Sequence, residues 1–352
     1  TAYASGSRFR FHESRPRSNY ESKTEEKTRM KVLEIENLST HYLLGKETVY
    51  AVDDVSFGIN AGETFGLAGE SGCGKTTVAK SIMRILPDNG LIVGGKIWLD
   101  GQEIVGLSEN EAKKFRWRKA SMVFQYAMSA FNPVLRVGDQ IAEVLQEKER
   151  CTKDAAYERV KKLFEVVGLE RSRIRDYPHE FSGGMQQRAI IAQALACNPK
   201  LVIADEPVTA LDVVIQGKIL DLLKELKQKL SLAVLLITHD LSVIAEESDH
   251  VGIMYAGSLV EVGDVISVFK EPLHPYTAKL IGAFPSVAGE KVKLEFIPGT
   301  PPDLISPPKG CKFHERCPFA KPICKVESPK QEEFGKGHLA VCHFAGELDL
   351  HR

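Results

Sequence analysis

The stretch Gly69-Glu-Ser-Gly-Cys-Gly-Lys-Thr76 decides how the rest of this 352-residue chain is interpreted. It fits the pattern G-x-x-x-x-G-K-[ST] without departure, follows the apolar run Thr64–Ala68 and precedes a helical pattern at residues 77–83. A glycine-rich loop between a strand and a helix surrounds phosphate oxygens with backbone N–H groups, and the helix N-terminus adds positive potential. The sequence therefore predicts that a nucleoside triphosphate binds here.

Each residue type in this loop has a physical role in holding phosphate. Lys75 is expected to reach the β- and γ-phosphates, and the Thr76 hydroxyl to ligate Mg²⁺. Cys73 is interpreted as a tolerated small residue. The predicted nucleotide contacts in this segment are Gly69, Glu70, Ser71, Gly72, Cys73, Gly74, Lys75, Thr76 and Thr77.

Further apolar runs repeat the pattern of the strand before the loop. They occupy residues 120–124, 201–204 and 233–237, and each is typical of a strand buried on both faces of a parallel sheet. Helical patterns alternate with them, as at residues 215–230. Strands and helices in alternation predict an α/β domain. Residues 127–180 lack strand signals and are interpreted as a helical insertion.

Polar residues follow three of these strands. Asp205 and Glu206 end one strand, His239 ends another, and Gln125 ends a third. We expect Asp205 to hold hydrated Mg²⁺ and Glu206 to polarise the attacking water. His239 is predicted to contact the γ-phosphate, because ligands bind at the carboxyl ends of strands in open α/β sheets. The Gln125 amide oxygen would reach Mg²⁺ or the water.

The segment Phe181-Ser-Gly-Gly-Met-Gln-Gln-Arg188 identifies the family. Together with the ordered elements above and Ala210-Leu-Asp212, it makes residues 30–263 resemble the ATP-binding subunit of ABC transporters. The resemblance implies a phosphate-loop NTPase core with an antiparallel β subdomain and an inserted helical subdomain. It also implies ATP hydrolysis coupled to transport.

In that family two ATPase subunits enclose two ATP molecules between them. The resemblance implies that Ser182, Gly183 and Gly184 contact the γ-phosphate held by the opposite subunit, and that Asp212 spans the interface. A helix N-terminus at this segment suits anion binding. The helical insertion would dock two membrane permease subunits. Whether the second ATPase subunit is a copy or a relative is left open.

An aromatic residue upstream of the loop stacks on adenine in this family. Tyr42 is the predicted stacking residue. Tyr50 is the alternative, because residues 43–48 resemble an extra hairpin turn between the two tyrosines.

Composition changes after Gly263, where prolines such as Pro272, Pro285 and Pro301 become frequent. Proline disfavours long helices and central strands, so residues 264–352 are interpreted as an appended irregular module. The segments at residues 271–277, 297–302 and 311–318 resemble the tail of ATPase subunits from oligopeptide and dipeptide importers. The resemblance implies import of peptides, delivered by an extracytoplasmic binding protein. Oligosaccharide or nickel-complex import, and a soluble ABC ATPase of DNA repair or translation, are the alternatives.

Cysteines crowd into this module, at Cys311, Cys317, Cys324 and Cys342. Such clustering favours metal ligation over disulfides where no secretory signal is evident. The resemblance implies a [4Fe–4S] cluster, while four thiolates also suit Zn²⁺. Free thiols or disulfides are the remaining alternative. We expect replacement of Cys317 to destabilise the module and to spare basal ATP hydrolysis.

The overall composition excludes several classes. Lys+Arg 46 against Asp+Glu 47 gives a net charge of −1, which argues against a dedicated nucleic-acid binder. No apolar run is long enough to span a membrane, so any membrane role must come through a partner. The family resemblance implies a peripheral place on the cytoplasmic face of the membrane. Residues 1–29 have the composition of a flexible tail, and a natural start at Met30 is plausible.

Overall fold

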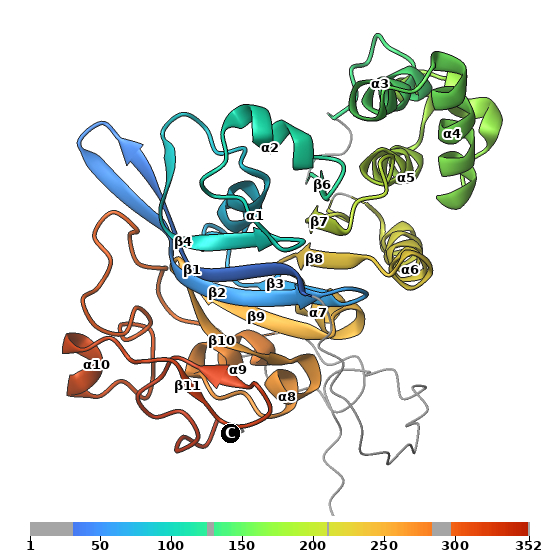
Figure 1. The fold of residues 1–352 in the computed structure, drawn as a ribbon. Helices are drawn as coiled ribbons and strands as arrows, with labels where there is room; N and C mark the ends of the chain where they lie inside the picture. Colours follow the sequence, from blue (N-terminus) through green and yellow to red (C-terminus); the bar gives the residue numbers. More distant parts are fainter. Residues whose placement is uncertain (1–30, 125–129, 210, 284–296, 351–352) are drawn as a thin grey trace, which may run out of the picture.

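The computed structural model describes residues 31–124, 130–209, 211–283 and 297–350, drawn in colour in Figure 1. The strands are β1 (Lys31–Leu44), β2 (Glu47–Asn60), β3 (Thr64–Ala68), β4 (Gly90–Leu99), β5 (Gln102–Glu103), β6 (Ala120–Val123), β7 (Leu201–Asp205), β8 (Ala233–Ile237), β9 (His250–Tyr255), β10 (Ser258–Asp264), β11 (Glu332–Glu333) and β12 (Leu339–Ala340). They form a four-stranded sheet in the order β2-β1-β4-β5 and an eight-stranded sheet in the order β11-β12-β10-β9-β3-β8-β7-β6.

The centre of the larger sheet is parallel and buried on both faces. Strands β3, β8, β7 and β6 are neighbours in that order, and every one of their residues is buried. Their continuous apolar sequences suit a strand covered on two sides. Because β3, β7 and β8 are parallel, their carboxyl ends lie at one edge of the sheet. The loops that carry the predicted site residues begin at this edge.

The smaller sheet is antiparallel and packs on one face of the larger one (Figure 1). Buried positions such as Leu33, Ile35 and Val55 share one cluster with residues of β3. The rings of Phe57 on β2 and Phe65 on β3 stack with centroids 4.4 Å apart. The antiparallel β subdomain implied by the family resemblance therefore packs directly beside the strand that precedes the phosphate loop.

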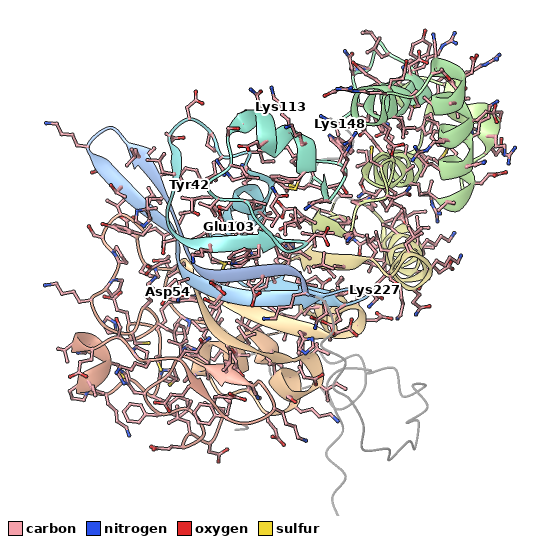
Figure 2. The ribbon with its side chains drawn as sticks, viewed as in Figure 1. Tyr42, Asp54, Glu103, Lys113, Lys148 and Lys227 are labelled. Carbon is pink, nitrogen blue, oxygen red and sulfur yellow. The ribbon has the colours of Figure 1, made fainter. Side chains whose placement is uncertain are left out.

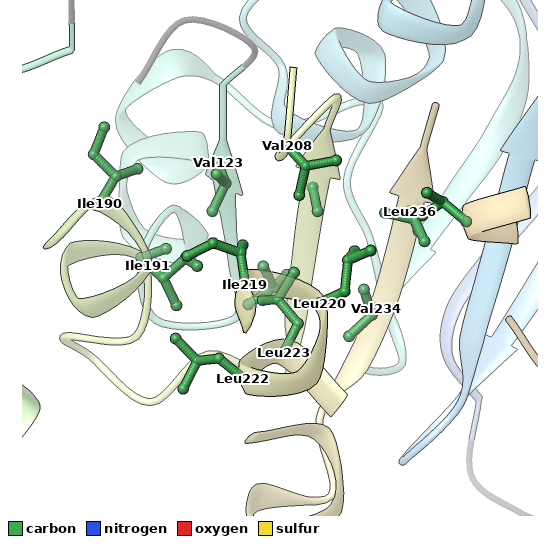
Figure 3. Packing of buried hydrophobic residues seen from close by; sticks show 14 of the residues in the cluster. Val123, Ile190, Ile191, Val208, Ile219, Leu220, Leu222, Leu223, Val234 and Leu236 are labelled. Atoms are coloured by element: carbon green, nitrogen blue, oxygen red, sulfur yellow. The ribbon is translucent and has the colours of Figure 1, made fainter. Parts of the chain in front are cut away.

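Helices cover both faces of the larger sheet. The described residues contain the helices α1 (Lys75–Met83), α2 (Glu109–Phe115), α3 (Val137–Glu149), α4 (Lys153–Val166), the 3₁₀ helices η2 (Arg171–Arg175) and η3 (Pro178–Glu180), α5 (Gly183–Ala194), α6 (Val213–Leu230), α7 (Leu241–Glu247), α8 (Val265–Lys270), α9 (Pro275–Gly282) and α10 (Pro322–Val326). Figure 3 shows Ile219, Leu220 and Leu223 of α6 packing against β7, β8 and α5. This contact fixes α5 relative to the sheet.

Helices α3 and α4 stand at one end of the molecule, next to α5 (Figure 1). Within residues 130–180 the structure contains these two helices, η2 and η3, and no strand. Tyr157 of α4 donates a hydrogen bond to Asp139 of α3, and Arg159 pairs with Glu149. Of the described residues, none lies in a helix that is both long and apolar enough to cross a membrane.

The C-terminal region consists of short helices, short strands and turns, and it is docked on the larger sheet. Strand β12 pairs with β10 through Glu261↔Ala340 and Val262↔Leu339. The Glu261 carboxylate, which is 1% exposed, accepts hydrogen bonds from the backbone N–H groups of Leu273 and His274 and contacts Nε2 of His338 at 2.8 Å. These contacts attach residues beyond 264 to the ATPase sheet.

Candidate active site

The phosphate loop follows the buried end of β3 and leads into α1. Gly74 is the N-cap of α1 with φ +107°, and a Cβ there would lie 2.2 Å from the Ala51 carbonyl oxygen. A Cβ at Gly69 would lie 2.1 Å from the Met254 carbonyl oxygen. Only glycine fits such close backbone approaches. The loop is therefore held between β9 and β2 by backbone contacts that the motif glycines permit.

Lys75 turns back across this loop. Its Nζ donates to the carbonyl oxygens of Gly69 at 2.7 Å and Glu70 at 2.9 Å, and the residue is 7% exposed. The Cys73 thiol is buried beside it, and burial raises the pKa of that thiol. The ammonium group thus lies within the loop curve, where phosphate oxygens are expected.

Thr76 and Asp205 meet although they are far apart in the sequence. The Thr76 hydroxyl donates to Oδ1 of Asp205 at 3.3 Å. Asp205 ends β7 and is 3% exposed, and burial raises the pKa of its carboxyl above the usual range, while the Thr76 hydrogen bond opposes that shift. A hydroxyl and a carboxylate side by side are oxygen donors of the kind that Mg²⁺ prefers. The donor set fits the predicted magnesium site.

Glu206 and His239 form the second pair. Oε1 of Glu206 lies 3.1 Å from Nδ1 of His239, and Oε2 accepts a hydrogen bond of 2.8 Å from the Thr209 hydroxyl. The pair forms because β7 and β8 are parallel neighbours whose carboxyl ends adjoin. Sequence reasoning missed Thr209, whose only signal is its place three residues after Glu206.

The family signature segment opens α5. Ser182 is its N-cap, and its hydroxyl accepts a hydrogen bond from the Met185 N–H at 3.4 Å. Gly184 packs against Ile215 of α6. Among the described residues no hydrogen bond joins Ser182 or Gly183 to the phosphate loop of the same chain.

Of two other predicted site residues, Asp212 and Gln125, the structure describes only Asp212. Asp212 is exposed and caps α6, with Oδ1 accepting from the Ile215 N–H at 3.0 Å. Gln125, predicted to reach Mg²⁺ or water, lies outside the described residues, as does Ala210.

The two candidate adenine-stacking tyrosines lie in different surroundings. Tyr42, labelled in Figure 2, lies on β1, and its hydroxyl is 3.3 Å from the Thr77 hydroxyl at the start of α1. Tyr50 instead packs edge-on against His41, with ring centroids 4.6 Å apart, and its N–H bonds the Leu304 carbonyl. Tyr42 is therefore the one in contact with the segment that follows the phosphate loop.

Two residues that sequence reasoning did not place at the site contact the phosphate loop from the C-terminal region. The Arg316 guanidinium makes two hydrogen bonds to the Glu70 carboxylate, at 2.7 and 2.9 Å. The Tyr276 hydroxyl accepts from the Glu70 N–H at 3.0 Å. Both lie in segments that resemble the importer tail, but no local pattern marks their contact with Glu70, since 246 and 206 positions separate them from it.

The four clustered cysteines line one small cavity of about 10 Å³, and all four are free thiols. Burial raises the pKa of Cys311 to about 12 and of Cys317 to about 11. His314 Nδ1 and His343 Nε2 bond to backbone carbonyls. The described residues contain no group of three or more His, Cys, Asp or Glu side chains placed to hold a metal ion.

The fold and this geometry define a phosphate-loop ATPase, and the chain belongs to the ATP-binding proteins of ABC transporters. It matches the ABC transporter family over residues 52–209 and the C-terminal region of oligopeptide/dipeptide transporters over residues 260–324.

Two curated relatives narrow the class further. The chain is 44% identical over 315 residues to the dipeptide transport ATP-binding protein DppD of Bacillus subtilis (strain 168), covering 89% of this chain and 94% of that one. It is 45% identical over 313 residues to the oligopeptide transport ATP-binding protein OppD of Escherichia coli (strain K12), covering 88% and 92%. A dimeric structure of the ATP-binding cassette MJ0796 bound to ADP and Pi is similar with a TM-score of 0.60 at 28% identity, covering 66% of this chain and 98% of that chain.

Proposed function

We propose that this ATPase powers the import of dipeptides or oligopeptides through separate membrane permease subunits. Two contacts at one edge of the sheet support the ATP hydrolysis in this proposal: Thr76 meets Asp205, and Glu206 meets His239. The peptide cargo is supported by the match of residues 260–324 and by the names of the relatives.

The proposed chemistry follows from these pairs. Lys75 and the loop N–H groups bind the triphosphate, and Thr76 and Asp205 hold Mg²⁺, which supplies charge neutralisation when bound. The Glu206 carboxylate orients and polarises the attacking water, and His239 steadies that carboxylate and contacts the γ-phosphate. Tyr42 supports adenine. Gln125 is proposed to reach the metal or the water.

The proposed working unit contains two ATPase subunits. Ser182, Gly183 and Gly184 would close on the γ-phosphate bound by the other subunit, with Asp212 between the sites. The dimeric form of the similar cassette supports this arrangement. ATP then joins the subunits, and loss of the bridging phosphate separates them, which is a ligand-driven switch.

We propose the domain boundaries of the chain from its similarity to the same family. Residues 30–263 form the ATPase domain, and the helical part at about 127–180 docks two permease subunits at the cytoplasmic face of the membrane. Residues 264–352 form the extension. An extracytoplasmic binding protein would deliver the cargo.

Reconstituted transport tests this function. The chain would be produced together with the permease and ATPase subunits that neighbouring genes encode, and the complex reconstituted into vesicles. Uptake of labelled di- and oligopeptides would then be measured with ATP. Uptake that requires ATP and is abolished by Lys75→Ala is the expected result. Transport of oligosaccharides or nickel complexes instead would contradict the proposed peptide cargo. Recovery of the chain with ribosomes or DNA would contradict the proposed transport function.

We also propose that Cys311, Cys317, Cys324 and Cys342 ligate a [4Fe–4S] cluster, with Zn²⁺ as the alternative. Support comes from the donor set, since four free thiols line one cavity. A cubane distributes its four thiolates over separate irons, so it does not require three donors around a single ion. The cluster would stabilise the irregular segment.

Anaerobic purification tests the cysteine centre. A brown protein with iron and acid-labile sulfide in equal amounts is expected, and Cys324→Ser should lose both. A colourless protein carrying zinc would support the alternative, and one carrying neither would refute the centre.

A further inference from the structure

Glu70 is a phosphate-loop residue that the C-terminal region holds directly. Its carbonyl oxygen accepts from Lys75 Nζ, its N–H donates to the Tyr276 hydroxyl, and its carboxylate pairs with Arg316. The side chain of Glu70 is 25% exposed, and that of Arg316 is 6% exposed. A largely buried, bidentate pair of this kind is stronger and more directional than a surface ion pair.

The Arg316 guanidinium is itself held in place. Its Nε donates to the Pro298 carbonyl at 2.8 Å, and Nη1 lies 3.3 Å from the Tyr255 hydroxyl. The guanidinium carbon is 5.7 Å from the centre of the Tyr255 ring. Arg316 therefore presents its charge to Glu70 from a fixed position and does not reach it as a mobile surface chain.

The ring of Tyr276 is fixed in the same way. Tyr276 is fully buried, and its ring contacts those of Tyr255 and Phe313 with centroids 4.6 and 5.4 Å away. Phe313 belongs to the segment that carries Cys311 and Cys317. A packed aromatic group thus connects the cysteine-bearing segment to the backbone of the phosphate loop.

Electrostatics explains why this contact matters for nucleotide. A triphosphate is a polyanion, and an unneutralised carboxylate in the loop that surrounds it would repel it. The guanidinium neutralises the charge of the Glu70 carboxylate and restricts rotation of its side chain. The positive charge of Lys75 is then not offset by Glu70 and can attract the phosphates.

We propose that Arg316 is a positioning residue for the phosphate loop, which neutralises and orients Glu70 so that the C-terminal region sets the affinity for MgATP. The inference rests on the proposed function in one respect, namely that the loop binds ATP. Because Cys317 follows Arg316 directly, we expect replacement of Cys317 to weaken MgATP binding, while hydrolysis at saturating ATP is spared as stated above.

The test compares two cations of the same segment in the full-length protein. Arg316→Gln removes the contact with the loop. Lys312→Gln is the matched control, because Lys312 also attaches the C-terminal region to the core, through Asp53 at 2.7 Å, Ser258 at 2.7 Å and the Ala256 carbonyl, without touching the loop. Both variants are measured for MgATP affinity, for the KM and kcat of hydrolysis, and for thermal unfolding.

Arg316→Gln should weaken MgATP binding about tenfold and raise KM with little change in kcat, because a buried charge loses its partner. Lys312→Gln should bind within about twofold of the unchanged protein while losing similar thermal stability. Adding Glu70→Gln to Arg316→Gln should restore much of the affinity, since the repelling charge is then gone.

Three results would overturn the proposal: unchanged affinity in Arg316→Gln, an equal loss in Lys312→Gln, or no recovery in the double variant. Should Arg316→Gln fail to fold, Arg316→Lys keeps the charge, and an intermediate loss of affinity is expected from its missing second hydrogen bond. Failure of the unchanged protein to bind MgATP would instead count against the proposed function.

Discussion

Glu206 adopts a backbone conformation that few side-chain-bearing residues take. Its φ is +48°, immediately after β7 ends at Asp205. Its N–H is bonded to the Ile237 carbonyl at 2.8 Å, and its carboxylate to Thr209 and His239. Backbone conformations of this kind cost energy and persist where the surroundings enforce them, often at functional sites. The left-handed turn aims the carboxylate toward β8, where His239 emerges.

Glu206→Gln tests the role of this carboxylate. Glutamine has nearly the same shape, so ATP binding should be retained, while loss of the general base should slow hydrolysis by about 10²–10⁴-fold. Phosphate release measures the rate, and size-exclusion chromatography with ATP measures the closed dimers that should accumulate. Thr209→Val, which removes only one hydrogen bond to the carboxylate, should cost less. Turnover equal to that of the unchanged protein would remove Glu206 from the chemistry.

At the scale of elements, the contact between α5 and α6 links the signature segment to the sheet. Ile219 and Leu223 of α6 pack in the main hydrophobic cluster with Ile190 and Ile191 of α5 (Figure 3). The first turns of the two helices also meet, because Gly184 of α5 lies against Ile215 of α6. Asp212, the predicted interface residue, caps the same turn of α6. Signature and interface residues thus belong to one packed unit.

Gly184→Ala tests this unit. The added Cβ would lie 2.7 Å from Cγ2 of Ile215, so the Ile215 side chain or the two helices must shift. Overpacking of this size costs about 1–3 kcal/mol, so ATP-dependent dimerisation in the Glu206→Gln background should weaken roughly tenfold. Ile215→Ala in the same chain should recover part of the loss. Gly217→Ala is the matched control, since nothing lies within 4 Å of its added Cβ; an equal effect of both alanines would contradict the argument.

At the scale of the whole molecule, the C-terminal region and the ATPase domain share one sheet and one core. Strand β12 extends the sheet beyond β10, and Phe313 belongs to the same hydrophobic cluster as α5 and α6. Interfaces that continue a core are expected to unfold with it. The stability of the chain is therefore a property of both parts together.

Global stability should carry a pH dependence from Glu247 at the end of α7. Its side chain is 9% exposed, and burial raises its pKa from 4.5 to about 6, opposed by Lys224. Between these values the folded state holds the proton that the unfolded state has lost. The free energy of unfolding should therefore fall, by up to about 2 kcal/mol, as the pH rises through this window.

Glu247→Gln removes this titration. Chemical denaturation of both proteins at pH 4.5 and pH 7 should show that the variant gains stability relative to the unchanged protein at the higher pH. The same difference in unfolding free energy at both pH values would show that the Glu247 carboxyl does not titrate abnormally.

Local sequence determined the phosphate loop, the buried strands, the position of the signature at a helix start and the family. Each of these depends on residues adjacent in the chain: glycines permit the loop between Gly69 and Gly74, and apolar runs specify strands such as β7. The prediction of a phosphate-loop ABC ATPase rests on these segments, and the family and fold comparisons confirm it.

Only the tertiary structure decided which of these segments meet. The order of the parallel strands places Glu206 against His239, the β1–α1 contact selects Tyr42 over Tyr50 as the neighbour of Thr77, and the docking of the C-terminal region brings Arg316 to Glu70. The physical reason is that motifs encode local backbone geometry, whereas a pair such as Arg316 and Glu70 depends on how a whole sheet and its added strands pack.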